Sequence, residues 1–288
     1  MSGNALDGGE GVVMAHDDHP DVRWERIECD GTSFQVLRTT PHGAAATRPT
    51  FVLVHGLGVS GFYFEPLIQE LADHAPVIVF DLPGAGRTAE TDGKLTISGL
   101  ARVLRDVVDQ LHLGKVVLVG HSMGTQVVVE ALARYPELAD AAALLAPVVP
   151  PSARKLGPLL AHFMRTSWHE PFAAVWRACV GYIQMAPSWL WKQTQAMLHY
   201  PIEERIRDVR ADLILIRASH DYVAPRDFLA QLRAAAGGQR TIMREMPNAA
   251  HHMMATHADA LTANILRIAG VHDKEAEAEG QANLKTQL

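Results

Sequence analysis

The sequence contains little cysteine and no long apolar run. Its two cysteines, Cys29 and Cys179, lie far apart with no Cys-x-x-Cys pair, which excludes a disulfide framework and a cysteine-ligated zinc site and predicts buried thiols. No apolar stretch approaches the roughly 18 residues that a membrane span requires. The first residues are acidic where a secretory signal would be basic. We therefore expect a cytoplasmic protein without a membrane segment.

The chain also lacks an excess of basic charge. It has 26 lysines and arginines against 32 acidic residues, which gives a net charge of −6. The excess acid lies in the two tails, residues 1–22 and 271–288, which have little to bury and are predicted to be disordered. The remaining body is close to neutral and offers no electrostatic field for nucleic acid. With 48% hydrophobic and 20% charged residues, the chain has the composition of an ordinary globular protein.

The body begins with a predicted β-hairpin, because two strand-like runs flank the turn sequence Asp30-Gly31-Thr32-Ser33. Five later runs are continuously apolar, as strands are when helices cover both faces of a parallel sheet. These runs are residues 51–56, 77–81, 115–120, 142–147 and 213–218. A further strand is expected in the run RTIMREM near the end of the body.

Apolar residues recur with helical spacing on both sides of the run at 115–120. The alternation of strands and helices predicts a doubly wound α/β fold with a core of residues 23–147 and 201–270. No strand pattern occurs between residues 148 and 200, and this interval is too long for an ordinary connection. We therefore expect residues 148–200 to form an inserted helical lid.

The strongest chemical signal is Gly120-His121-Ser122-Met123-Gly124, which follows an apolar strand and precedes a helical pattern. This context is typical of a nucleophile elbow, because a sharp strand-to-helix turn needs small residues two positions before and after the serine. Ser122 is therefore the candidate nucleophile. The alternative is a chance pentapeptide in a strand-turn-helix without chemistry.

A serine nucleophile needs a base that a third group orients. Asp221 follows the run at 213–218, and His251 and His252 follow the next strand. The order Ser122, Asp221, His251 matches one established chain order of catalytic triads. Adjacent side chains in an extended loop point to opposite sides, so only one histidine should face the serine. We predict that it is His251 and that His252 lies in the first turn of the following helix.

A tetrahedral intermediate needs preorganised N–H donors for its oxyanion. Met123 follows the candidate nucleophile, and Leu57 lies in the turn His55-Gly56-Leu57-Gly58 after an earlier strand, where the glycines let the backbone approach a substrate. The backbone N–H groups of Leu57 and Met123 are the predicted oxyanion hole. The histidines show no metal-binding spacing, so no metal is expected.

The segments HGLG, DLPGAGRT, GHSMG, SHD and PNAAHH resemble the α/β-hydrolase superfamily and occur in its order, over the body from Trp24 to Ala269. The resemblance implies an eight-stranded, mostly parallel sheet, a helical cap between strands six and seven, and a Ser-His-Asp site without a cofactor. Some members carry the acid after strand six, but the corresponding run APVVP in this chain contains no carboxylate. This difference favours Asp221.

The resemblance implies a serine hydrolase, and we expect a carboxylesterase that cleaves a small or medium ester through an acyl-enzyme. The alternatives are a carbon–carbon bond hydrolase of ring-fission products, a lactonase or a thioesterase with the same triad, and a ligand receptor without turnover. Ser122 argues against epoxide hydrolases and haloalkane dehalogenases, which have Asp at the elbow. His121 stands where carbon–carbon hydrolases typically have Asn. The sequence carries no signal for an oligomeric state.

The lid supplies most of the candidate substrate contacts. It holds eight aromatic residues, and five basic residues against a single acid, Glu170. Aromatic side chains offer large contact areas for an apolar substrate, and the positive balance would favour an anionic one. The alternative is that the aromatics anchor the lid and the bases are solvated. The candidate pocket residues are His55, Trp168, Trp176 and Trp189.

Overall fold

The structure is a computed structural model that describes most of the body of the chain. The described residues are 21–41, 43–91, 94–170, 175–176, 181–183 and 185–271. Residues 1–20 and 272–288, which make up nearly all of the two predicted tails, lie outside them, as does Cys179. Cys29 is buried, as predicted.

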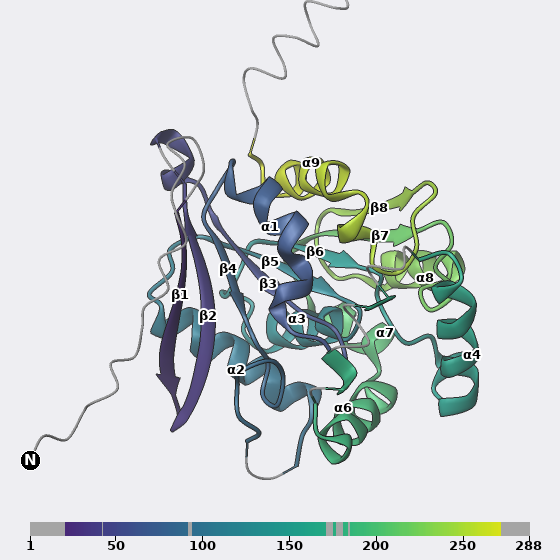
Figure 1. The fold of residues 1–288 in the computed structure, drawn as a ribbon. Helices are drawn as coiled ribbons and strands as arrows, with labels where there is room; N and C mark the ends of the chain where they lie inside the picture. Colours follow the sequence, from purple (N-terminus) through teal and green to yellow (C-terminus); the bar gives the residue numbers. More distant parts are fainter. Residues whose placement is uncertain are drawn as a thin grey trace, which may run out of the picture.

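The described part of the chain is built around an eight-stranded sheet (Figure 1). Its strands are β1 (Asp21–Cys29), β2 (Thr32–Thr40), β3 (Thr50–Val54), β4 (Val77–Phe80), β5 (Val116–His121), β6 (Ala141–Leu145), β7 (Asp212–Ala218) and β8 (Thr241–Met246). They lie in the order β1-β2-β4-β3-β5-β6-β7-β8, in which the first two pairs of neighbours are antiparallel and the others parallel. The predicted doubly wound, mostly parallel sheet is confirmed.

The antiparallel edge of the sheet begins with the predicted hairpin. Asp30 and Gly31 connect β1 to β2 with φ angles of 48° and 74°. Two-residue hairpin turns of this kind require the left-handed region, which Gly adopts freely and Asp tolerates. Strand β1 already includes Asp21 and Val22. The predicted tail boundary at residue 22 is therefore wrong by two residues, because these residues pair with β2.

Helices cover both faces of the sheet. They are α1 (Glu65–Ala72), α2 (Ile97–Gln110), α3 (Met123–Arg134), α4 (Leu156–Ser167), α6 (Pro187–His199), α7 (Ile202–Arg205), α8 (Arg226–Ala235) and α9 (Ala258–Ile268), with short 3-10 turns η1 (Gly43–Thr47), η2 (Gly61–Phe64), η3 (Pro151–Ala153), η4 (Ile206–Asp208) and η5 (Met253–Ala255). Helix α1 packs with α9 on one face, and α2 packs with α3 on the other (Figure 1). Within the described ranges, no helix combines the length and apolar character needed to cross a bilayer.

This coverage buries the central parallel strands on both faces, which explains their continuous apolar sequences. Helix α2 begins where the Thr96 side chain accepts a hydrogen bond from the N–H of Gly99 at 3.0 Å. Its predicted apolar face, including Leu100 and Leu104, is buried. Because β3, β5, β7 and β8 are parallel, the loops that follow them meet at one edge of the sheet. Those loops carry the predicted site residues.

The lid, residues 148–200, supplies helices α4 and α6 between β6 and α7. Its described part contains no strand, in agreement with the predicted helical insertion. Gln126 of α3 holds both ends of the lid, because its Nε2 donates to the carbonyl oxygens of Val148 at 2.9 Å and Met197 at 3.0 Å. The lid is therefore tied to the helix that begins at the predicted elbow.

The elbow requires glycine at position 124. A Cβ atom on Gly124 would lie 2.1 Å from the carbonyl oxygen of Val54 in the central strand β3, which has no room to move. We expect Gly124→Ala to lower the free energy of unfolding by about 3 kcal/mol, measured by urea denaturation. Gly157→Ala in α4 is the matched control, since nothing lies within 4 Å of its added Cβ. Equal stabilities of the two variants would contradict the tight packing of the elbow.

Candidate active site

Ser122 lies between β5 and α3 in a strained backbone conformation, with φ 54° and ψ −121°. The flanking glycines permit this turn, since a Cβ on Gly120 would lie 2.6 Å from the carbonyl oxygen of Gly124. The N–H of Ser122 donates to the carbonyl oxygen of Leu145 in β6 at 2.9 Å. This is the strand-turn-helix geometry that the sequence predicts. In this position Ser122 lines a cavity.

Asp221 and His251 come together although they are thirty positions apart. Nδ1 of His251 lies 2.8 Å from Oδ2 of Asp221, and both side chains are buried. The other carboxylate oxygen, Oδ1, accepts the N–H groups of Val223 at 2.9 Å and Ala224 at 3.2 Å. His251 lines the same cavity as Ser122. The structure thus brings the three residues of the predicted triad to one edge of the sheet.

Each member of this pair favours the charged form of the other. Burial raises the pKa of Asp221, but the charge and hydrogen bond of His251 and the N–H groups of Ala224 and Val223 outweigh it, so the pKa is lowered. Burial lowers the pKa of His251, but the charge and hydrogen bond of Asp221, with the charge of Glu170, outweigh it and the pKa is raised. Asp221 is therefore ionised, and it favours an imidazolium at His251.

Arg217 fixes the loop that carries Asp221. Its buried guanidinium donates to the carbonyl oxygens of Ala224 at 3.2 Å, Asp221 at 3.3 Å and Ser219 at 3.4 Å. It also forms an ion pair with Glu245 of β8. A rigid loop keeps the carboxylate of Asp221 in line with His251.

His252 does not lie where the sequence predicts. It precedes the 3-10 turn η5, and α9 begins only at Ala258. Its ring lines the cavity at 5.5 Å from the His251 ring, so both histidines border the cavity. The prediction failed because the loop is not extended at this point. The N–H and Nδ1 of His252 lie 2.8 Å and 3.2 Å from Oε1 of Glu170, which turns the side chain inward.

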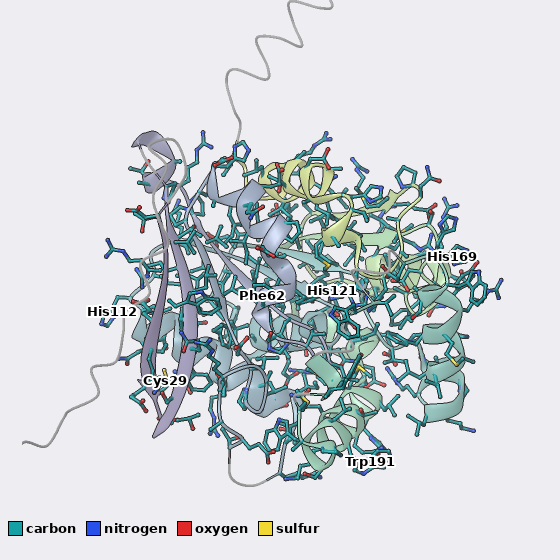
Figure 2. All side chains as sticks on the ribbon, in the orientation of Figure 1. Cys29, Phe62, His112, His121, His169 and Trp191 are labelled. Atoms are coloured by element: carbon teal, nitrogen blue, oxygen red, sulfur yellow. The ribbon has the colours of Figure 1, made fainter. Side chains whose placement is uncertain are left out.

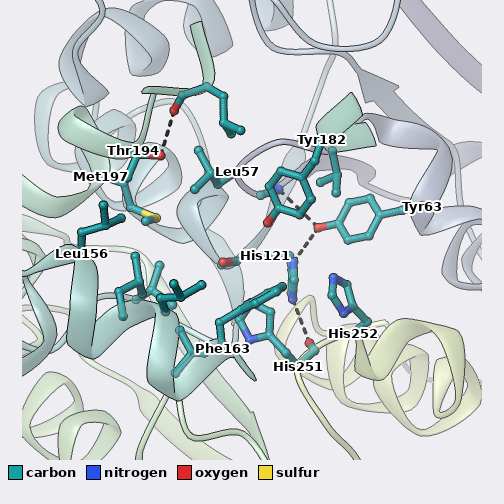
Figure 3. Close-up of a pocket in the computed structure, with 18 residues that line it drawn as sticks. Leu57, Tyr63, His121, Leu156, Phe163, Tyr182, Thr194, Met197, His251 and His252 are labelled. Atoms are coloured by element: carbon teal, nitrogen blue, oxygen red, sulfur yellow. Dashed lines mark hydrogen bonds between the residues drawn. The ribbon is translucent and has the colours of Figure 1, made fainter. Parts of the chain in front are cut away.

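His121 joins three parts of the site. Its Nε2 donates to the carbonyl oxygen of His251 at 2.9 Å, and its Nδ1 accepts the hydroxyl of Tyr63 at 2.5 Å (Figure 3). That hydroxyl in turn accepts the N–H of Gly56 at 3.3 Å. Burial, then the charges of His251 and His252, hold the pKa of His121 well below its usual range. His121 lies in the interior of the molecule, as Figure 2 shows, and is neutral.

The predicted oxyanion donors flank the candidate nucleophile. Leu57 lines the cavity in the turn after β3, next to Gly56. Met123 is the first residue of α3, so its N–H belongs to the helix turn whose N–H groups lack intrahelical acceptors. Leu57 therefore lies at the cavity and Met123 directly follows Ser122, and the role of their N–H groups as donors stays a prediction.

The cavity has a volume of about 350 Å³ and is mostly apolar (Figure 3). One wall is formed by the loops of the core, with Leu57, Val59, Tyr63 and Val223. The lid forms the opposite wall. Its contributing residues are Val148, Leu156, Leu159, Leu160, Phe163, Tyr182, Leu190, Thr194 and Met197.

The predicted pocket residues are corrected by this geometry, because none of them lines the cavity. His55 is fully buried and turned toward the backbone, with Nδ1 on the carbonyl of Gly56 and Nε2 accepting the N–H of Leu82. Trp189 is also buried and donates to the carbonyl of Pro83.

Two further predicted pocket residues face outward. Trp168 is 90% exposed and Trp176 is 59% exposed. The aromatic lid therefore contacts the cavity through Phe163 and Tyr182 instead. Aromatic content identified the right segment, but it could not distinguish the inner face of each helix from the outer one.

The basic residues of the lid also lie away from the cavity, as far as they are described. Arg154 forms an ion pair with Glu203 of α7. Arg165 stacks over the Tyr222 ring at 4.0 Å, and Lys192 lies 4.8 Å from the Trp189 ring. The predicted preference for an anionic substrate loses its basis, because these charges do not reach the apolar cavity.

The sequence matches a known protein family over most of its length. The family described as "Alpha/beta hydrolase family" matches residues 51–264, well over half of the chain. The chain belongs to the alpha/beta hydrolase family. The predicted resemblance is confirmed, and with it membership of a family of hydrolases.

Curated relatives match the chain over a limited length. The uncharacterized hydrolase YugF of Bacillus subtilis (strain 168) is 36% identical over 99 residues, which cover 34% of this chain and 36% of YugF. The chain spans 36% to 41% of the length of the first three curated relatives.

Solved structures match the chain over most of its length. The enol-lactonase from Burkholderia xenovorans LB400 has a TM-score of 0.71 and 20% identity, covering 85% of this chain and 99% of that one. The serine hydrolase CarC, involved in carbazole degradation, has a TM-score of 0.69 and 20% identity, covering 87% and 100%. At such identities the likeness shows the fold alone.

Sequence reasoning missed several residues that hold the candidate site together. They are Tyr63, Arg217 and the lid acid Glu170. A signal existed for Glu170, because it is the one acid among five bases in residues 148–200. Among the described residues, no cluster of His, Cys, Asp or Glu has the arrangement of a metal site.

Proposed function

We propose that this hydrolase cleaves neutral carboxylic esters with a short or medium apolar acyl group, through Ser122, His251 and Asp221. The observation that carries the proposal is the buried 2.8 Å contact between His251 and Asp221 beside a cavity that also holds the strained Ser122. Family membership supports hydrolysis, and the residue geometry supports the serine mechanism.

The proposed reaction begins when Oγ of Ser122 attacks the ester carbonyl and His251 takes the hydroxyl proton. Asp221 stabilises the resulting imidazolium and keeps Nδ1 as the donor toward its carboxylate. The N–H groups of Leu57 and Met123 hold the oxyanion, and His251 returns the proton to the leaving alcohol. Water then attacks the acyl-enzyme with the same base, which releases the acid and restores Ser122.

The cavity supports the choice of substrate. Its volume of about 350 Å³ lies near the lower end of the range for small-molecule sites. Its lid wall is formed mainly by aliphatic and aromatic side chains, with Thr194 as a polar member. A neutral apolar acyl chain can be buried there without leaving a charge unpaired.

A panel of p-nitrophenyl esters tests this proposal. Each buried methylene contributes about 0.8 kcal/mol, so kcat/KM should rise about tenfold from acetate to butanoate and fall for chains too long for the cavity. A monoanionic succinate ester of similar length should be a poor substrate. Thioester, lactone and ring-fission dienoate substrates run in parallel test the other reactions. A dienoate turned over faster than every ester would contradict the ester proposal.

The pH dependence follows from the raised pKa of His251. Protonated His251 cannot accept the Ser122 proton, so activity is lost when pH falls below the pKa of His251 in the folded protein. That pKa lies above the ordinary value of 6.5. We expect kcat/KM for a neutral ester to rise with pH along a single limb whose midpoint lies above 6.5. A flat profile from about pH 5 to 9 would contradict a histidine base.

A further inference from the structure

Buried side chains form hydrogen bonds with both the carbonyl oxygen and the N–H of the peptide group that joins His251 to His252. Its carbonyl oxygen, from His251, accepts Nε2–H of His121 at 2.9 Å, and its N–H, from His252, donates to Glu170 at 2.8 Å. The Glu170 side chain is only 3% exposed, and His121 is 1% exposed. Water cannot readily replace either partner at such burial, so both contacts fix the position of this peptide.

The two side chains come from different parts of the fold. His121 is the residue before Ser122 and is fixed at the end of β5. Glu170 belongs to the lid and follows α4. Its Oε1 contacts the N–H and Nδ1 of His252, so the lid is bonded to the residue next to His251. The core therefore holds one side of the peptide and the lid holds the other.

We propose that Glu170 is a positioning residue that couples the lid to His251. The base is then held in its working position only while the lid lies against the base loop, residues 247–252, which carries His251. This inference rests on the proposed function of Ser122, His251 and Asp221. When Glu170 moves away, the N–H of His252 loses its acceptor. The lid then no longer fixes the position of the base loop. His121 then holds the peptide alone.

Glu170 also contributes its charge. The titratable groups around the His251 ring are Asp221 behind it, His121 from β5, the neighbouring His252 and Glu170 from the lid. Burial raises the pKa of Glu170, but the hydrogen bonds and charge of His252, with the charge of His251, outweigh it and the pKa is lowered. Glu170 is thus a second carboxylate, after Asp221, that favours the protonated form of His251.

Three variants separate this role from a general loosening of the lid. Glu170→Ala removes both the acceptor and the charge, and Glu170→Gln keeps an amide oxygen as acceptor but removes the charge. Glu203→Gln is the matched control, because Glu203 in α7 also pairs with a lid residue, Arg154, but it is not bonded to His252. The readouts are kcat and KM for p-nitrophenyl acetate, the pH profile of kcat/KM, and the rate of reaction with a small fluorophosphonate.

For Glu170→Ala we expect kcat and the fluorophosphonate rate to fall 10- to 100-fold, about the cost of a small misplacement of a catalytic group, with KM within threefold. Glu170→Gln should retain most of kcat. In both variants the acidic limb of the pH profile should move down by about half a pH unit or more, because a negative charge near His251 is lost. Glu203→Gln should leave the rates and the limb unchanged.

The inference is overturned if both Glu170 variants keep the wild-type rates and pH profile, or if Glu203→Gln reproduces their losses. If Glu170→Ala does not fold, the acidic limb of the pH profile of Glu170→Gln tests the inference, and an unchanged limb overturns it. Failure of the proposed function would look different, because the wild-type protein itself would then neither hydrolyse the ester nor react with the fluorophosphonate at Ser122.

Discussion

Ser122→Ala is expected to lower kcat for a p-nitrophenyl ester by at least about 10⁴-fold, because no other group can form the acyl-enzyme. The residual rate should come from the oxyanion donors and the cavity alone. The fold should be unchanged, since alanine fits the turn without new contacts. Steady-state kinetics beside a thermal melt measure both quantities.

Ser219→Ala is the matched control for this prediction. Ser219 lies in the loop that carries Asp221, and its side chain is not part of the cavity lining. It should retain the wild-type kcat within about twofold, as most surface changes do. Ester hydrolysis that survives in Ser122→Ala would show that the chemistry runs through another group.

His251→Ala should reduce kcat about as severely as Ser122→Ala, because triad members act as a unit. For the same reason, the double variant should be scarcely slower than either single variant. His252→Ala should lose far less, about tenfold, because it keeps the main-chain N–H that Glu170 binds and removes only the ring contact. Severe loss confined to His252→Ala would mean that the neighbouring histidine is the base.

The elements that were predictable from the sequence depend on local constraints. The hairpin turn at Asp30-Gly31 and the elbow around Ser122 both need particular residues at particular backbone angles, and the sequence contains those residues. The parallel strands are recognisable because burial on both faces leaves continuous apolar runs. Asp221 and His251 are then found by their positions after strands whose ends share one edge.

The contacts that the sequence could not predict join residues distant along the chain. His55 and Trp189 were expected in the pocket, but each is satisfied by the backbone of the 81–84 turn, a pairing with no local pattern. His252 was expected on a helix, and Glu170 from the lid draws it into the site. The positions of polar side chains in the interior depend on such long-range partners. The periodicity of a sequence indicates only which face of a helix or strand is apolar.

Ser122 is expected to form a covalent intermediate with the help of His251 and Asp221. Reaction with a small fluorophosphonate followed by peptide mass spectrometry tests it most directly. We predict one adduct per chain on the peptide that contains Ser122, no adduct in Ser122→Ala, and slow labelling in His251→Ala. An adduct on a different residue, or rapid ester hydrolysis by a protein that remains unlabelled, would contradict the account.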